Sequence, residues 1–230
     1  MNKHISEQYD NELTQIRELL MEMGGLVEQQ VARASQSLTT HDMALANQVR
    51  DNESRLNQME VELDDHCVSI IAKRQPTAGD LRIVVSVMKT ITDLERIGDE
   101  ADRIAQMALS VAKSEVPEDQ YADFRSMADK VSRSLNRALD AFARLDVESA
   151  LRVIEEDQDI DSAYGQMVRQ CIEIMRDESE QIEHTMSLIW AARALERVGD
   201  HAKNMAEYVI YQVKGLDVRH SPSADLDVEE

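Results

Sequence analysis

The pentapeptide Glu95-Arg96-Ile97-Gly98-Asp99 is repeated in the second half of the chain as Glu196-Arg197-Val198-Gly199-Asp200. An alanine-rich run follows each copy, at residues 101–108 and 202–206. Residues four apart lie one turn apart on the same face of an α-helix, so each helical copy would place two carboxylates side by side. One such pair is common in helices, but its repetition with arginine and glycine kept inside it predicts two related helical sites.

The composition favours helix along almost the whole chain. Only seven of the 230 residues are glycine and three are proline. These are the residues that most often interrupt helices. Hydrophobic residues make up 43% of the chain and aromatic residues only 3%. We therefore expect a packed core between helices, built from aliphatic and methionine side chains.

The charge and the chain's other global features point to a cytoplasmic protein. Forty-five acidic residues against twenty-five basic ones give a net charge of −20. This argues against nucleic acid as a partner and is compatible with metal cations or a basic protein surface. We expect no signal peptide, because the first residues lack an apolar segment, and no membrane-spanning stretch. Cys67 and Cys171 suggest no disulfide framework.

Apolar residues at steps of three and four predict the helices. From Ile5 to Leu38 they predict a first helix, which the Gly24-Gly25 pair is expected to loosen. Thr39 to Asp42 predicts a turn with a capping box, and Pro76 ends a second helix over 43–74. Thr77 and Asp80 predict the capping box of a third helix. Its buried stripe should run from Leu81 to Ala105. Beyond a breaker at 113–119, the pattern predicts helices over 121–145, 146–177 and 182–214, and a frayed tail from 217.

The two halves can be aligned residue by residue, which predicts the architecture. At constant spacing, one set of residues in the first half matches another in the second: Asp42, Ala46, Val49, Glu53, Leu56 and Cys67 match Asp146, Ala150, Val153, Asp157, Ile160 and Cys171. We therefore predict an all-α fold of six long helices in two pseudo-symmetric antiparallel three-helix bundles. The bundles should span residues 1–113 and 118–215, and the polar tail 216–230 should be disordered.

Antiparallel hairpins predict which acidic residues face each pentapeptide. Asp99 should lie level with Glu53 and Glu95 with Asn57; in the second unit, Asp200 should lie near Asp157 and Glu196 near Asp161. Asp102 adds a carboxylate to the first site, where the second site has Lys203. The candidate metal ligands are therefore Glu53, Glu95, Asp99, Asp102, Asp157, Asp161, Glu196 and Asp200.

Two interpretations of these acids remain open. Oxygen-only clusters suit hard divalent cations such as Mg, Mn or Ca, and carboxylate-rich sites also accept Fe or Zn. Alternatively, the acids form solvated faces balanced by arginines such as Arg96 and Arg197. We expect no enzyme, because no phosphate-binding loop and no nucleophile elbow are present. The alternative is a metal-dependent phosphoesterase, although no His or Lys converges on the sites. His201, next to Asp200, should point away from the site and lie at the surface.

The segments ERIGDEADRIA, ERVGDHAKNMAEY and IIAKRQPTAGDLR closely resemble the PhoU family, in particular its proteobacterial branch. The likeness extends from NKHISEQYDNELTQIR to YVIYQVKG and so covers nearly the whole chain. It implies two pseudo-symmetric three-helix bundles and negative regulation of phosphate uptake and of the phosphate starvation response. The implied partners are the ATPase subunit of the phosphate ABC transporter and the phosphate-sensing histidine kinase. Contact with the membrane would be indirect, through these partners, and a homodimer is expected.

The resemblance also implies metal clusters bound through E(D)-x-x-x-D motifs. Glu95, Asp99, Glu196 and Asp200 match these positions, and Asp157-x-x-x-Asp161 fits the same pattern. The first unit departs from the pattern at Glu53 and Asn57, which implies weaker metal binding there.

Overall fold

The computed structural model describes residues 7–112 and 118–219. Within them it contains seven α-helices and two short 3₁₀ turns and no strand, which confirms the all-α prediction. The helices are α1 (Glu7–Thr40), α2 (Met43–Asp51), α3 (Glu53–Arg74), α4 (Ala78–Val111), α5 (Ala122–Arg144), α6 (Val147–Asp177) and α7 (Ile182–Lys214). The turns η1 (Glu118–Tyr121) and η2 (Ser179–Gln181) precede α5 and α7.

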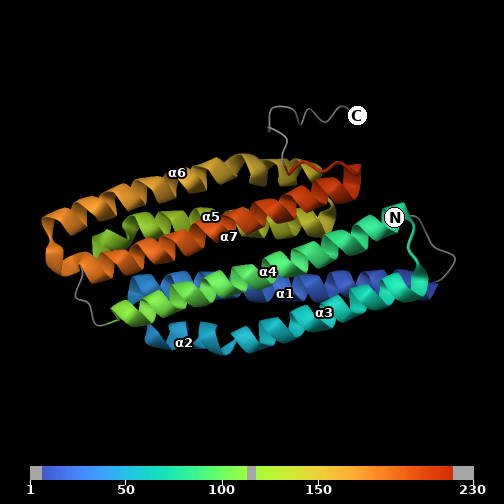
Figure 1. Ribbon diagram of the computed structural model, residues 1–230, viewed down its shortest axis with the longest axis horizontal. Coiled ribbons are helices and arrows are strands. Elements are labelled where there is room, and N and C mark those ends of the chain that lie inside the picture. Colours follow the sequence, from blue (N-terminus) through green and yellow to red (C-terminus); the bar gives the residue numbers. More distant parts are fainter. Residues whose placement is uncertain (1–6, 113–117, 220–230) are drawn as a thin grey trace.

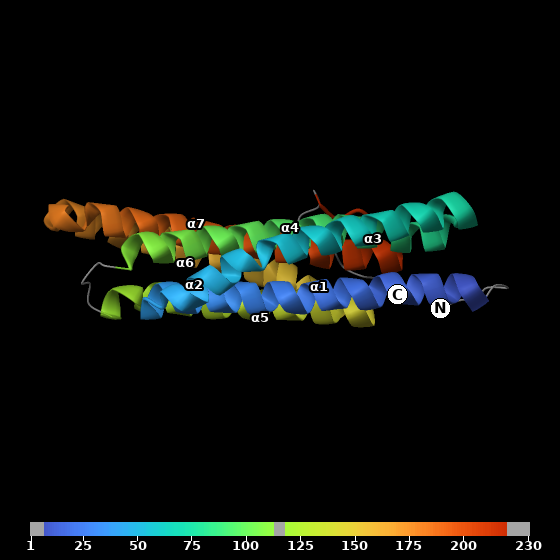
Figure 2. The same ribbon diagram turned by 90° about the horizontal axis from the view of Figure 1, so that it is seen from below.

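The helices form two antiparallel bundles that lie side by side (Figure 1). Helices α1 to α4 pack on one another and make the first bundle, in which α2 and α3 together take the place of one helix; α5, α6 and α7 make the second. The bundles meet where α4 packs along α7 and α1 along α5. Figure 2 shows α4 and α7 in one layer and α1 and α5 in the other. Helices α3 and α6 flank the α4–α7 pair at opposite edges.

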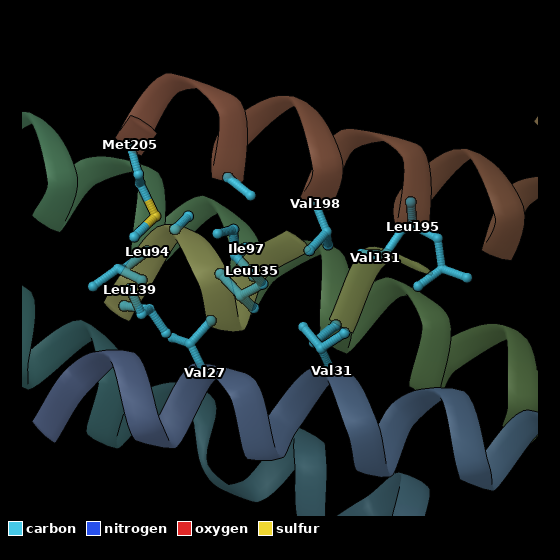
Figure 3. Packing of buried hydrophobic residues seen from close by; sticks show 14 of the residues in the cluster. Val27, Val31, Leu94, Ile97, Val131, Leu135, Leu139, Leu195, Val198 and Met205 are labelled. Atoms are coloured by element: carbon cyan, nitrogen blue, oxygen red, sulfur yellow. The ribbon is translucent and has the colours of Figure 1, made fainter. Parts of the chain in front are cut away.

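One connected hydrophobic core runs through both bundles. Figure 3 shows Val27 and Val31 of α1 facing Leu94 and Ile97 of α4, with Leu135 of α5 between them. Leu195 and Val198 of α7 enter the same core from the other side. Fully burying one aliphatic side chain stabilises the fold by about 1.5–3 kcal/mol, so this shared core holds the two bundles together.

The predicted second helix is divided at Asn52. Helix α2 ends at Asp51 and α3 begins at Glu53, whereas its counterpart α6 is continuous. The Asn52 side chain donates to the carbonyl of Gln48 at 3.0 Å, so it competes with the backbone pairing of the helix. The apolar spacing continues through this break and no glycine or proline stands there, so the sequence carried no sign of it.

Both predicted capping boxes are wrong. Helix α1 continues through Thr40, and Thr39 instead donates to the carbonyl of Gln36 at 3.1 Å. Asp42 alone caps α2, accepting from the backbone N–H of Ala44 at 2.9 Å and of Leu45 at 3.1 Å. Thr77 precedes α4 but makes no capping hydrogen bond with its side chain.

The ends of the predicted elements differ in smaller ways. Leu81, expected to begin the buried stripe of α4, is exposed. Of the tail predicted to be disordered, residues 220–230 lie outside the described residues, but Val218 is buried and Gly215 ends α7 with a φ of 73°. Ile5 and residues 113–117 of the predicted breaker also lie outside the described residues. None of the described helices combines the length and the hydropathy needed to cross a membrane.

Gly24 serves the packing of α1 on α5. Helix α1 is continuous through the Gly24-Gly25 pair, so the expected loosening is absent. A Cβ atom on Gly24 would lie 2.5 Å from Cδ2 of Leu139 in α5, whereas a Cβ atom on Gly25 would meet nothing within 4 Å. The first glycine therefore allows the two bundles to approach, and the second does not contribute to packing.

These neighbouring glycines give a matched pair of substitutions. Gly25→Ala should stabilise the protein by about 0.5–1 kcal/mol, because alanine is the better helix former. Gly24→Ala brings the same gain but forces Leu139 to move, and overpacking costs about 1–3 kcal/mol. We expect Gly24→Ala to be less stable than Gly25→Ala by that amount in urea unfolding. Equal stabilisation by both substitutions would contradict the assignment of Gly24 to the α1–α5 contact.

Candidate metal centre

The glycine inside each pentapeptide lies where a neighbouring helix comes closest. A Cβ atom on Gly199 would lie 3.0 Å from Cδ1 of Ile160 in α6, and one on Gly98 would lie 2.0 Å from Cδ2 of Leu56 in α3. A side chain at either position would have to displace Leu56 or Ile160, so glycine favours this close approach of the two helices. The approach brings the carboxylates on either side of the glycine up to the facing helix.

Three carboxylates of the second unit converge, and we call them the second acidic cluster: Asp161 of α6 with Glu196 and Asp200 of α7. Each offers one oxygen, and these oxygens all lie within 4.8 Å of one another. No other group of this kind lies among the described residues. Glu196 is only 8% exposed, while Asp161 and Asp200 are open to solvent. The predicted meeting of Glu196 with Asp161 is therefore present in the structure.

The electrostatics of the second acidic cluster favour a cation. Burial and the neighbouring Asp200 carboxylate raise the pKa of Glu196, and burial with Asp157 and Asp161 raises the pKa of Asp200. Arg193 donates a hydrogen bond to Oε1 of Glu196 and offsets part of this repulsion. Oε2 of Glu196 is buried and has no hydrogen-bond partner among the described residues. A buried carboxylate oxygen without a partner is costly, so this atom is free to bind a positive ligand.

Asp157 lies next to the cluster but is already paired. Its side chain is buried, and Nζ of Lys203 donates to Oδ2 at 2.8 Å. The Asp157 charge still raises the pKa of Asp200. The structure therefore places Asp157 beside Asp200, as predicted, with its charge compensated by a lysine of α7.

The first unit differs from its prediction. The carboxylate of α3 that influences the first pentapeptide is Glu60: burial raises the pKa of Glu95, and Asp99 and Glu60 raise it further. The pKa of Glu60 is raised in turn by burial, Asp64 and Asp99. Glu53, expected beside Asp99, is exposed in the first turn of α3. We call Glu60, Asp64, Glu95 and Asp99 the first acidic cluster.

The register of the α3–α4 hairpin explains why Glu60 was missed. The contact between Gly98 and Leu56 places Glu95 level with about residue 59, not with Asn57. Residue 59 is next to Glu60, so Glu60 lies within one residue of the level of Glu95. The signal was in the sequence, because Glu60 and Asp64 have the same four-residue spacing as the pentapeptide carboxylates.

Asp102 is buried and paired with a base. Nε of Arg50 in α2 lies 3.3 Å from its Oδ1, and Gln106 donates to its Oδ2. In the first unit the acid is thus on the long helix α4 and the base on α2, whereas in the second the base, Lys203, is on α7. The two units keep one compensating ion pair beside each cluster but exchange the helices that carry the charges.

Between the clusters, buried polar pairs join α4 to α7. Asp93 accepts from Asn204 at 3.2 Å and lies 2.6 Å from Nδ1 of His201. Glu100 is paired with Arg197 at 3.1 Å and with Arg103 at 2.6 Å. The expectation that His201 lies at the surface is wrong, since its side chain is only 14% exposed. Its position on α7 does point away from the cluster, but α4 covers it there.

The donor set of the second acidic cluster suits a hard divalent cation. Its donors are all carboxylate oxygens, which Mg²⁺, Mn²⁺ and Ca²⁺ prefer. Its three oxygens are close enough to share one ion, and Glu196 also has a buried oxygen without a hydrogen-bond partner among the described residues. In the first acidic cluster, burial is likewise the largest cause that raises the pKa of Asp99, but Arg103 partly compensates it.

Comparison with known proteins places this geometry in a family. The family model described as "PhoU domain" matches residues 20–108 and 124–209, one segment in each bundle. The phosphate-specific transport system accessory protein PhoU homolog of Pseudomonas putida is 45% identical over 96% of this chain and 86% of its own length. The phosphate-specific transport system accessory protein PhoU of Escherichia coli is 42% identical over 99% of this chain and 94% of its own.

Solved structures agree in fold and extent. The crystal structure of PhoU from Pseudomonas aeruginosa superposes with a TM-score of 0.88 at 42% identity, covering 90% of this chain and 100% of that one. The phosphate transport system regulatory protein PhoU from Streptococcus pneumoniae gives 0.84 at 27% identity, covering 91% and 99%. The resemblance seen in the pentapeptide segments is therefore confirmed, and the chain belongs to the PhoU family.

Proposed function

We propose that this chain is a cytoplasmic negative regulator of phosphate uptake and of the phosphate starvation response. The observation that carries the proposal is the match over nearly the full length to proteins named as accessory or regulatory components of phosphate transport. The names of these relatives describe no enzymatic activity.

The regulator would act as an adaptor between two partners, the ATPase subunit of the phosphate ABC transporter and the phosphate-sensing histidine kinase. Two bundles on one shared core give a long, stiff scaffold with separate surfaces. The net charge of −20 suits binding to basic protein surfaces. Attachment to the membrane would come through these partners.

The second acidic cluster would hold a divalent cation. Asp161, Glu196 and Asp200 would supply the ligands, and Asp157 would remain with Lys203. The bound charge would remove the repulsion between α6 and α7 and so stiffen this hairpin. The first acidic cluster would bind more weakly, because no three of its carboxylates converge as closely as those of the second cluster do among the described residues.

A metal titration tests the assignment. We expect Mn²⁺ to bind the metal-free protein in isothermal titration calorimetry, and Glu196→Gln or Asp200→Asn to weaken the tightest site roughly tenfold or more. Glu95→Gln serves as the matched control in the first cluster and should leave that site within about twofold. The assignment fails if Glu95→Gln weakens the tightest site as much as Glu196→Gln does.

The raised pKa values predict a pH dependence of stability. Because the pKa of Asp200 is raised by folding, the stability that it contributes is present below its unfolded pKa and is lost as pH rises through its folded pKa. Without metal, the stability of Asp200→Asn relative to the wild-type chain should therefore rise as pH increases from about 4, where an unfolded aspartate ionises, and level off above the folded pKa of Asp200. Thermal unfolding in EDTA measures this difference; a gap that closes over the same range would contradict it.

The adaptor function has its own test. We expect the wild-type chain to copurify with the transporter ATPase or with the histidine kinase from detergent extracts of phosphate-replete cells. Extracts from phosphate-starved cells provide the comparison. Reproducible absence of both partners under mild conditions would contradict the adaptor function, whatever the metal titration shows.

A further inference from the structure

The outer face of the α6–α7 hairpin carries an exposed apolar patch, formed by Ile172 of α6 with Ile182, Met186 and Trp190 of α7. Trp190 is 59% exposed and is the only tryptophan of the chain. Such a side chain is usually buried, because it can remove a large apolar area from water. Several exposed hydrophobic residues gathered on one hairpin mark an interaction surface more often than single ones do.

The apolar patch is continuous with the second acidic cluster. Along α7, steps of three and four lead from Ile182 and Met186 through Arg193 to Glu196 and Asp200, so these residues share one stripe. Along α6, the equivalent stripe leads from Ile172 back to Asp161. The guanidinium of Arg193 lies 5.6 Å from the centre of the Tyr164 ring and joins the two stripes between patch and cluster.

Two positions of the apolar patch are exposed in both halves of the internal repeat. In the alignment of the halves, Ile172 corresponds to Val68 and Ile182 corresponds to Leu81, and both of those residues are also exposed. Trp190 corresponds to Lys89, whose ammonium lies over the rings of Tyr208 and Tyr211. The two units therefore share an exposed apolar pair, and only the second has an aromatic residue, Trp190, beside it.

The charges around the apolar patch select its occupant. The hairpin end carries a group of exposed acids against two bases, Arg169 and Arg176: the acids are Glu173, Asp177, Glu178, Glu180 and Glu183. The second acidic cluster lies beyond Arg193 at the other end of the patch, so acids outnumber bases around it. A second copy of this chain would bring like charges together, which is unfavourable. A groove between two antiparallel helices accommodates a third helix.

We propose that the apolar patch binds an amphipathic helix of a partner protein, with lysine or arginine residues flanking its apolar face. This inference rests on the proposed adaptor function and assigns one partner to the α6–α7 hairpin. Trp190 would be the main anchor, at the edge of the patch nearest α4, since Ser187 and Arg197 on the same stripe of α7 contact Ser110 and Glu100 of α4. Tryptophan is prominent among residues that dominate binding energy.

The single tryptophan allows a direct test. The full chain is labelled with 5-fluorotryptophan and titrated separately with the purified transporter ATPase and histidine kinase, while sedimentation velocity shows whether a complex forms. When one of these partners binds, the ¹⁹F resonance of Trp190 should shift. Its solvent isotope shift between H₂O and D₂O should also disappear, because the ring is no longer exposed to water. Trp190→Ser should weaken that complex roughly 30-fold, the effect of a hot-spot residue, and Trp190→Phe should restore most of the affinity. Higher salt should weaken it further.

The control is Val213→Ser, which changes a 41% exposed side chain at the other end of α7. It should leave the affinity within about twofold. Met186→Glu provides a second variant of the patch that retains the fluorine reporter, and thermal unfolding verifies that each variant is folded.

A complex that leaves the Trp190 resonance unchanged, or that Trp190→Ser does not weaken, overturns the patch assignment and leaves the adaptor function standing. If the Trp190 resonance shifts when the concentration of this chain is raised with no partner present, the patch is a site of self-association and the assignment to a partner helix is overturned. Failure of the wild-type chain to bind either partner overturns the adaptor function as well.

Discussion

The close approach of two helix pairs, α3 to α4 and α6 to α7, is the constraint on which the rest of the structure depends. Gly98 and Gly199 make it possible, because any Cβ atom at these positions would press on Leu56 or Ile160. The same approach forces carboxylates of facing helices together, and like charges in a partly buried site repel. Packing and electrostatics therefore oppose each other at one place in each bundle. The apolar core supplies the stabilisation, and the acids are held in an arrangement that they would not adopt alone.

The two units resolve this conflict with different residues. The second unit concentrates three carboxylates around a buried unpaired oxygen, with Arg193 as the nearest compensating charge. The first adds Glu60 and Asp64, one turn apart on α3, to the pentapeptide pair, and no three of its acids converge as closely among the described residues. A duplicated fold has thus produced two sites of unequal charge density. This inequality gives a physical basis for expecting different metal affinities.

The sequence predicted the fold well and the site in part. Periodicity placed the helices over 121–145, 146–177 and 182–214 to within a residue or so of α5, α6 and α7, because these helices are strongly amphipathic and bounded by clear turns. The break at Asn52 was not predicted, because it lies in an otherwise periodic stretch and involves a local bond of the Asn52 side chain to the carbonyl of Gln48. The role of Gly24 was not predictable, because it depends on Leu139 of a distant helix. Both hairpins are shifted by about two residues from the prediction, since the Gly199–Ile160 contact places Glu196 level with about residue 163. The second cluster was predicted despite this shift, because Asp161 still lies between the levels of Glu196 and Asp200. In the first unit the same shift brings Glu60, and not Asn57, to Glu95. His201 was misplaced because helical phase describes one helix and says nothing of Asp93 on the next.

The pairs that join α4 to α7 make the two halves of the chain non-interchangeable. The residue that follows each pentapeptide is Glu100 in the first half and His201 in the second, and His201 contacts the buried Asp93. Two copies of the first half, placed in the same arrangement, would set a glutamate against that aspartate in a buried seam. Two copies of the second half would lose the acid altogether, because Ala194 stands where the first half has Asp93. Each half of the chain therefore carries side chains that complement the other half and that would not complement a second copy of itself.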